Sequence, residues 1–344
     1  MTGETFMSVV KRIVDKLINV YRSEGARESA IRALGYLQDK TVPTVTDPSV
    51  PDRRFALKYL FNLYFRAKYG HGTNVMEEDW DTLVLLDACR FDSFECVNKI
   101  PGELQSRISQ GVDSDEFVKK NFRGRTLHDT VYVTANPHVE MLDGDEFHDV
   151  VTEPLSEWDS EIQCVLPEQV TQSAIRAHQK YPRKRIIVHY MQPHDPPLGP
   201  TARELREEHQ IGGTLAEEGS STPQDRVLEL VARGEIPVER ARTAYRESLD
   251  IVLSEVSALL SEVSGKIVVS SDHGELFGEQ PYPLLGPLYE HYRNPRIEEL
   301  CRVPWFIPDF DGERRDTVGE EPVESGTYPG RVDIEQQLEA LGYK

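Results

Sequence analysis

The stretch of residues 266–279, K-I-V-V-S-S-D-H-G-E-L-F-G-E, constrains the fold of this chain more than any other. Its apolar, β-branched start at residues 267–269 is typical of a strand that is buried on both faces of a parallel sheet. Asp272 and His273 follow that strand, at the edge where open α/β sheets bind ligands. Together they can offer a carboxylate oxygen and an imidazole nitrogen to one divalent ion, and Gly274 lets the backbone turn sharply. A turn with only a structural role is the alternative.

Two further apolar runs lead to side chains of the same kind. Residues 82–86 (T-L-V-L-L) predict a buried strand that ends at Asp87. This carboxylate is placed either to bind a metal ion or to cap the helix that follows. Residues 186–190 predict another strand. His189 and His194 lie around its end and could hold an oxyanion or a second metal ion, although single histidines more often have structural roles.

Ser114 and Asn136 are polar residues at the ends of other predicted elements. Residues 111–122 predict a helix with Ser114 as its N-cap. A hydroxyl there lies in the positive field of the helix dipole, which lowers the cost of ionising it beside a metal ion. Capping alone is the alternative. Asn136 follows a strand predicted at residues 130–134, where its side chain could reach a substrate.

Strands and helices alternate between residues 76 and 310, which favours a three-layer α/β/α domain with a largely parallel sheet. Within it, the acidic residues 139–165 predict a loop. Residues 300–307 predict a last strand, in which Pro304 indicates an edge position or a strand start. The polar residues 199–239 predict an insertion that could cover the site as a lid. The other expected parts are a basic, helical N-terminal appendage at residues 1–75 and a polar C-terminal tail at residues 311–344.

The net charge of −20 argues against nucleic acid as the main partner, because binding phosphate backbones needs a basic surface. The charge is uneven, since residues 1–70 hold twelve Lys and Arg against seven Asp and Glu. This basic segment predicts either helices packed on the main domain or a docking surface for an anionic membrane or a lipid-linked substrate. The acidic remainder is typical of adaptation to high salt, which screens self-repulsion.

The cysteines favour an intracellular location. They are scattered without the paired spacing of a zinc cluster, which is typical of reduced thiols. The sequence shows no secretion-signal pattern and no run of about 18 apolar residues. We therefore expect a cytoplasmic protein, peripheral to the membrane if residues 1–70 dock there. The four cysteines are Cys89, Cys96, Cys164 and Cys301.

Several motifs, in their order along the chain, resemble those of one family. The chain has L-L-D-A-C-R-F-D at residues 85–92, H-Y-M-Q-P-H-D-P-P at residues 189–197 and S-S-D-H-G-E-L-F-G-E at residues 270–279, followed by E-H-Y and L-C-R-V-P-W-F. This order is similar to that of sulfatase-like members of the alkaline phosphatase superfamily, over residues 79–307. The chain looks closest to acid-rich sulfatase-like proteins of halophilic archaea, and more remotely like phosphoethanolamine and phosphoglycerol transferases.

The resemblance implies a metal-dependent hydrolase or transferase of phosphate or sulfate esters, with a hydroxyl nucleophile and a covalent intermediate. Its anionic ester substrate would be carried by a surface glycan or a lipid-linked sugar. One divalent ion is expected, and among Zn²⁺, Mn²⁺, Mg²⁺ and Ca²⁺ zinc suits a set of His and carboxylate ligands well. The expected metal ligands are Asp87, Asp272 and His273; the catalytic residues are Ser114, His194 and His291; the substrate-binding residues are Arg90, His189, Asn136 and Glu275.

The sequence departs from the family pattern in three respects. It has no C-x-P-S-R or C-x-A-S-R motif, so we expect no formylglycine and no ordinary sulfatase chemistry. The residues around Ser114 do not match the family's nucleophile motif. Asp195 is the one obvious spare carboxylate for a second ion, which favours a single ion. The alternative function is therefore a catalytically degenerate scaffold or binding protein in envelope or glycan assembly.

Overall fold

The computed structural model describes residues 53–211, 226–280, 286–291, 295–309, 313–323 and 337–338. The chain divides into two compact units, residues 1–68 and 69–344. Most of the predicted N-terminal appendage, the middle of the predicted insertion and most of the predicted tail lie outside the described residues. No helix in the described part of the chain is long and apolar enough to cross a membrane.

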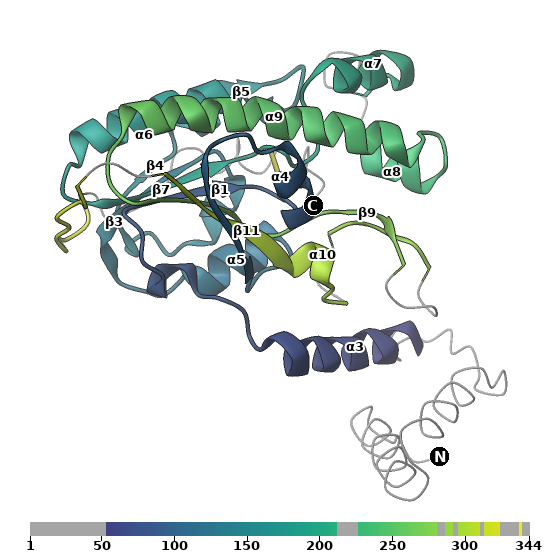
Figure 1. The fold of residues 1–344 in the computed structure, drawn as a ribbon, viewed down its shortest axis with the longest axis horizontal. Helices are drawn as coiled ribbons and strands as arrows, with labels where there is room; N and C mark the ends of the chain where they lie inside the picture. The colour runs from purple at the N-terminus through teal and green to yellow at the C-terminus, as the bar shows by residue number, and fades with distance from the viewer. Residues whose placement is uncertain are drawn as a thin grey trace, which may run out of the picture. The chain divides into compact units, whose positions relative to one another are not determined.

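Helix α3 belongs to the first unit except for its last residue, and helices and strands alternate through the second unit (Figure 1). The helices are α3 (Arg53–Tyr69), η1 (Val75–Glu77), α4 (Phe91–Val97), α5 (Ser114–Asn121), η2 (Pro137–Met141), η3 (Glu153–Glu157), α6 (Pro167–Lys180), α7 (Pro200–His209), α8 (Val227–Ala232), α9 (Val238–Glu262) and α10 (Glu298–Cys301). The strands are β1 (Thr82–Leu86), β2 (Gly102–Ile108), β3 (Leu127–Thr134), β4 (Phe147–Val151), β5 (Trp158–Asp159), β6 (Cys164–Val165), β7 (Arg185–Tyr190), β8 (Ile267–Ser271), β9 (Leu276–Glu279), β10 (Leu288–Glu290) and β11 (Arg302–Pro308).

A seven-stranded sheet forms the centre of this unit, in the order β2-β11-β8-β1-β7-β3-β4. The five strands from β8 to β4 are parallel, and β11 runs antiparallel to both of its neighbours. Helices α6 and α9 cover one face of the sheet, and α5 lies on the other (Figure 1). The predicted three-layer α/β/α fold with a largely parallel sheet is confirmed.

Strand β1 shows why an unbroken apolar run is needed in the middle of this sheet. Its side chains alternate between the two faces. Val84 and Leu86 belong to the core beneath α6 and α9. Leu83 and Leu85 pack with Phe117 of α5 in the core on the opposite face. Each face of the strand is therefore buried, and polar residues appear only where the strand ends.

The pairing register brings the ends of three strands to one place. Leu86, the last residue of β1, pairs with Tyr190 of β7 and with Ser271 of β8. Asp87 and Asp272, which follow β1 and β8, therefore leave the sheet side by side. This juxtaposition follows from the parallel arrangement, because carboxyl ends of parallel strands share one edge.

Of the two positions that Pro304 indicated, the edge of the sheet is wrong, and Pro304 lies near the start of β11. Strand β11 lies between β8 and β2, and β2 forms the edge. Pro304 precedes Trp305 and Phe306, the residues of β11 that pair with β8, so a residue without an N–H is tolerated there. Strand β2 was not predicted because its sequence, G-E-L-Q-S-R-I, has no apolar run.

The prediction of a loop at residues 139–165 is also wrong. These residues contain β4, the other edge of the sheet, and the short pair β5–β6. Strand β4 reads F-H-D-V-V, and only its first two residues are buried, so its pattern is not that of a central strand.

The predicted insertion contains α7 and α8. Apolar side chains of these helices, among them Leu205 and Leu230, form a separate cluster with Tyr245 of α9 and Phe277 of β9. This cluster is continuous with the strand that follows the D-H-G turn. The proposed lid movement of the insertion remains a prediction.

Candidate active site

Three buried side chains of metal-ligand type meet at the carboxyl ends of β1 and β8. Asp87 follows β1, and Asp272 and His273 follow β8. One ligand atom from each lies within 4.8 Å of those of the other two. None of the three residues has exposed surface. They are the residues predicted as metal ligands, and the register of the two strands explains why they meet.

The pKa values of the two carboxyl groups in this set are shifted in opposite directions. Burial, reinforced by the charge of Asp272, raises the pKa of Asp87 well above its ordinary value. Burial also opposes ionisation of Asp272, but His273 and His189 beside it hold its pKa below the ordinary value. A divalent ion between the two carboxylates would stabilise both in their charged form.

The orientation of His273 also fits a cation. Its Nδ1 lies 2.8 Å from the carbonyl oxygen of Gly274, which only accepts, so Nδ1 carries a proton. Burial lowers the pKa of His273, which favours the neutral ring. Nε2 then directs its lone pair at Asp87 Oδ1 and Asp272 Oδ2, 3.4 and 3.5 Å away. Asp87 Oδ1 is buried with no hydrogen-bond partner among the described residues. Three acceptor atoms that face one another fit a cation, and this donor set suits Zn²⁺.

Gly274 is required at this turn by close packing. A Cβ at this position would lie 2.0 Å from the backbone oxygen of Glu299. The Gly274 N–H donates to the carbonyl of Leu300 at 2.8 Å. The turn that carries His273 is therefore pressed against the segment leading into β11, which leaves no room for a side chain.

Ser114 directs its hydroxyl at all three ligand residues. Its Oγ lies 2.6 Å from Asp272 Oδ2, 3.2 Å from Asp87 Oδ2 and 3.4 Å from His273 Nε2. The N-cap of α5 is Asp113, whose carboxylate accepts from the first turn, so the prediction that Ser114 is the cap is wrong. Because Asp113 satisfies the helix end, the Ser114 hydroxyl faces the ligand set from the positive end of the helix dipole.

Asn136 links Asp87 to Ser114. Its Nδ2 donates to Asp87 Oδ2 at 2.8 Å and to Ser114 Oγ at 3.0 Å. Its Oδ1 accepts from the backbone N–H of His138 at 2.9 Å, which fixes the orientation of the amide. Asn136 was predicted to contact substrate. In the structure its amide hydrogen-bonds the side chains of Asp87 and Ser114 and so orients both.

We expect Asn136→Ala to lower turnover by about 10- to 100-fold while leaving the three ligands in place, as is usual when a group that orients metal ligands is removed. Turnover and bound metal should be measured on the same preparations. Thr171→Val, which removes a buried hydroxyl from α6, is the matched control. Equal turnover in the two variants would contradict the role given to Asn136.

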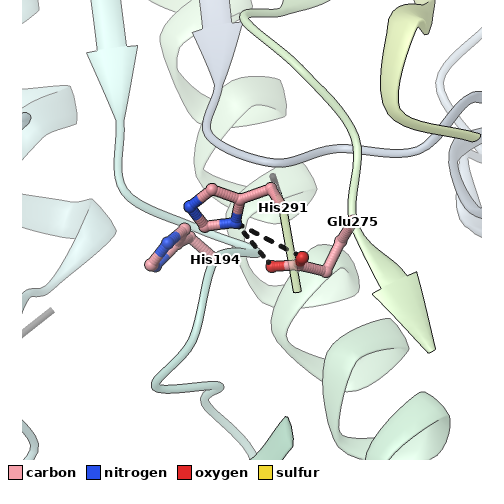
Figure 2. A group of neighbouring side chains, drawn as sticks. All are labelled: His194, Glu275 and His291. Carbon is pink, nitrogen blue, oxygen red and sulfur yellow. Dashed lines mark hydrogen bonds and ion pairs between the residues drawn. The ribbon is translucent and has the colours of Figure 1, made fainter. Parts of the chain in front are cut away.

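A second set of ligand-type side chains adjoins the first. His194, Glu275 and His291 offer atoms within 4.8 Å of one another. His291 Nδ1 lies 3.3 and 3.4 Å from the two carboxylate oxygens of Glu275. Figure 2 shows these side chains converging from three separate segments, with His291 between the other two. The His291 and His273 rings have centroids 4.7 Å apart, so the two sets are in contact.

The groups of the second set differ in charge. Burial, and then the neighbouring His291, lowers the pKa of His194 to about 3. Burial opposes ionisation of Glu275 and of His291, yet their pairing lowers the pKa of Glu275 and raises that of His291. The set therefore combines a neutral imidazole with an ion pair. Glu275, which was expected to contact substrate, supplies the carboxylate of this second set. Asp195, which was expected as the spare carboxylate, is not part of the set, and burial raises its pKa to about 7.

Arg90, predicted to bind substrate, is engaged by other protein groups. Its guanidinium donates to Asp92, to Glu279 and to the backbone oxygen of Glu275. The residue is 5% exposed. These contacts place Arg90 as the residue that fixes the segment carrying Glu275.

His189, also predicted to bind substrate, lies beside Asp272. Its Nδ1 is 2.8 Å from the hydroxyl of Tyr132, and its Nε2 is 3.6 Å from Asp272 Oδ2. Sequence reasoning missed Tyr132, and it also missed Tyr245, whose hydroxyl contacts the turn after β1. Both tyrosines lie in apolar patterns of β3 and α9 that assign them to the core, so no local signal marks them.

No protein-family model matches the chain, and no curated protein matches it. Among solved structures, the C-terminal periplasmic domain of phosphoethanolamine transferase EptC from Campylobacter jejuni is 13% identical, with a TM-score of 0.40 over 66% of this chain and 77% of that chain. A phosphonate monoester hydrolase from Silicibacter pomeroyi is 12% identical, with a TM-score of 0.41 over 76% and 72%. A protein in the alkaline phosphatase superfamily from Vibrio parahaemolyticus is 11% identical, with a TM-score of 0.33 over 68% and 61%.

Proposed function

We propose that this protein is a metal-dependent hydrolase or transferase of phosphate or sulfate esters in which Ser114 is the nucleophile. The position of Ser114 Oγ supports this proposal most strongly, because the atom contacts Asp87, Asp272 and Asn136 at once. A serine that only opened a helix would have no need to point into a buried group of metal-ligand side chains.

The residues that would hold the metal ion are Asp87, Asp272 and His273. A bound Zn²⁺, Mn²⁺, Mg²⁺ or Ca²⁺ would lower the pKa of the serine hydroxyl and offset the charge of the ester oxygens. Asn136 would keep Oγ oriented toward the incoming ester through the hydrogen bond that it already donates.

The chemical step forms one bond and breaks one. The Ser114 hydroxyl, its pKa lowered beside the ion, gives its proton to solvent; its Oγ attacks phosphorus or sulfur in line, and the bond from that atom to the leaving oxygen breaks. His194 and His291 hold the other oxygens of the transferred group, and the protonated His291 gives its proton to the leaving oxygen. Water, or a sugar or lipid hydroxyl, then attacks the same phosphorus or sulfur and gives its proton to His291, and the bond to Ser114 Oγ breaks, which completes hydrolysis or transfer. As the carrier of the ester we propose a surface glycan or a lipid-linked sugar.

The non-catalytic scaffold is the second candidate. The unmatched nucleophile motif favoured it, whereas a buried set of three ligands with a hydroxyl in reach of each supports catalysis. A scaffold has no need to bury carboxylates that oppose each other's ionisation.

Covalent trapping tests the proposal. The protein, loaded with Zn²⁺ or Mn²⁺, is incubated with 4-nitrophenyl esters of phosphate, phosphonate and sulfate, quenched in acid and digested. We expect release of nitrophenol with at least one ester and one transferred group on the peptide that contains Ser114. Turnover with the group on a different residue would reject the nucleophile, and no turnover with any ester would favour the scaffold.

We also propose that the basic N-terminal segment contacts an anionic membrane. Helix α3 has no acidic residue in its first turn and carries Arg66 and Lys68 in its last. Leu63 and Tyr64, which precede them, are 47% and 61% exposed. An amphipathic surface of this kind combines apolar insertion with attraction to anionic lipids.

Exchanging these four side chains, as Leu63→Ser, Tyr64→Ser, Arg66→Glu and Lys68→Glu together, should weaken binding to phosphatidylserine vesicles by about tenfold or more at low salt. Val323 is the other large apolar residue exposed in the described part of the chain, so Val323→Ser is the matched control. Sedimentation with vesicles measures the effect. Equal sedimentation of the two variants would contradict the proposal.

A further inference from the structure

The turn after β1 holds Asp87 in place with an unusual backbone conformation. Ala88 has a φ of 58°, in the left-handed region that residues with a Cβ rarely adopt. Such strain persists only where surrounding contacts impose it. The residue lies directly after a proposed metal ligand, so its conformation determines where that ligand points.

This conformation ties the two ligand-bearing strands together. With Ala88 in the left-handed region, its N–H donates to Asp272 Oδ1 at 3.1 Å. The next N–H, that of Cys89, donates to Ser271 Oγ at 2.9 Å. The turn after β1 therefore bonds directly to the end of β8, and relaxation of Ala88 would remove a donor from Asp272.

The hydroxyl of Tyr245, a residue of α9, bonds two backbone groups of this turn. The Tyr245 hydroxyl donates to the carbonyl of Ala88 at 2.7 Å and accepts from the N–H of Arg90 at 2.9 Å. Burial raises the pKa of Tyr245 well above its ordinary value, so the hydroxyl keeps the proton that it donates. The ring is held by Phe277, whose centroid lies 5.1 Å away.

We propose that Tyr245 is a positioning residue for the metal site, which holds Ala88 in its left-handed conformation so that Asp87 and Asp272 face the same ion. This inference rests on the metal site of the proposed function. It adds to that site a residue, Tyr245, that is not itself a metal ligand. Tyr245 touches neither metal nor ester; it acts through two backbone groups of the turn.

The test compares Tyr245→Phe, which keeps the ring and removes the hydroxyl, with the double variant Tyr245→Phe and Ala88→Gly. Glycine adopts a positive φ without steric cost, so it should remove the need for the hydroxyl. We expect Tyr245→Phe to bind Zn²⁺ at least tenfold more weakly in competition with a chelator, and the double variant to regain most of that affinity. Tyr190→Phe is the matched control, because it removes a buried phenol hydroxyl that bonds Thr171 and not the turn.

Each outcome separates this inference from the proposed function. Unchanged Zn²⁺ affinity in Tyr245→Phe, with metal bound by the wild type, overturns the positioning role and leaves the metal site intact. Weak binding that Ala88→Gly does not restore overturns the mechanism through the turn. A wild type that binds no divalent ion at all overturns the proposed function and this inference with it.

Discussion

The Asp272→Ala variant is expected to purify without a divalent ion and to lose turnover by about 10³-fold or more, because a bound metal supplies several kcal/mol of charge stabilisation in reactions of this class. Asp272 accepts hydrogen bonds from several groups around the site. It bonds the backbone of Ala88 and of His273 through one oxygen and Ser114 through the other. Without it, Asp87 is the only carboxylate left in the ligand set.

Elemental mass spectrometry of the purified protein measures this result. Asp81→Asn is the matched control, since Asp81 is a buried carboxylate just before the opposite end of β1 and lies outside both ligand sets. The wild type and the control should hold the same amount of metal. Metal retained by Asp272→Ala at the wild-type level would contradict the assignment of Asp272 as a ligand.

The same measurement counts the ions. The sequence favoured one ion, and the structure assembles His194, Glu275 and His291 as a second set of ligand type. One ion per chain that is lost in Asp272→Ala leaves the second set to bind ester oxygens directly. Two ions, of which Glu275→Gln loses only one, would place the second ion there and correct the expectation of a single metal.

The Ser114→Ala variant is expected to keep its metal and to lose turnover by about 10³-fold or more, because the nucleophile is gone while the ligands remain. The trapped covalent group should disappear with it. This combination distinguishes the nucleophile from a ligand, whose loss removes metal and turnover together.

Ser248→Ala is the control for the loss of a buried hydroxyl, because Ser248 in α9 is fully buried and its Oγ has no hydrogen-bond partner among the described residues. Turnover should be unchanged in this variant. Turnover of Ser114→Ala at the wild-type level would move the nucleophile to another group and leave the metal site standing.

The part of the site carried by parallel strands could be predicted from the sequence. The apolar runs before Asp87 and Asp272 identify central strands, and the carboxyl ends of such strands meet at one edge. The runs do not give the strand order in which β8 and β1 are neighbours, and it was the family resemblance that assigned the two carboxylates to one ligand set. Ser114 was predicted at the start of a helix and was assigned as the nucleophile through the family resemblance, and the N-cap of that helix is Asp113.

The remainder depends on contacts that have no local signal. The edge strands β2 and β4 have mixed polar sequences because one side of each lacks a neighbouring strand, so they do not show the apolar runs of central strands. The contact of Tyr245 with Ala88 joins residues 157 positions apart, and nothing in the sequence of α9 distinguishes this tyrosine from a core residue. Glu275 joins His291 across 16 positions through the β9–β10 hairpin, which the sequence did not predict.

The place of β11 has a consequence for the order in which the molecule is completed during synthesis. Strand β2 emerges early from the ribosome, but among the described strands it pairs only with β11. The same late segment closes on Gly274 beside the ligand His273. Until residues near 308 have emerged, β2 lacks its partner among the described strands, and Gly274 lacks the backbone of Glu299 against which it packs. The pairing of β2 and the packing beside His273 therefore depend on long-range contacts that become available only after β11 is synthesised.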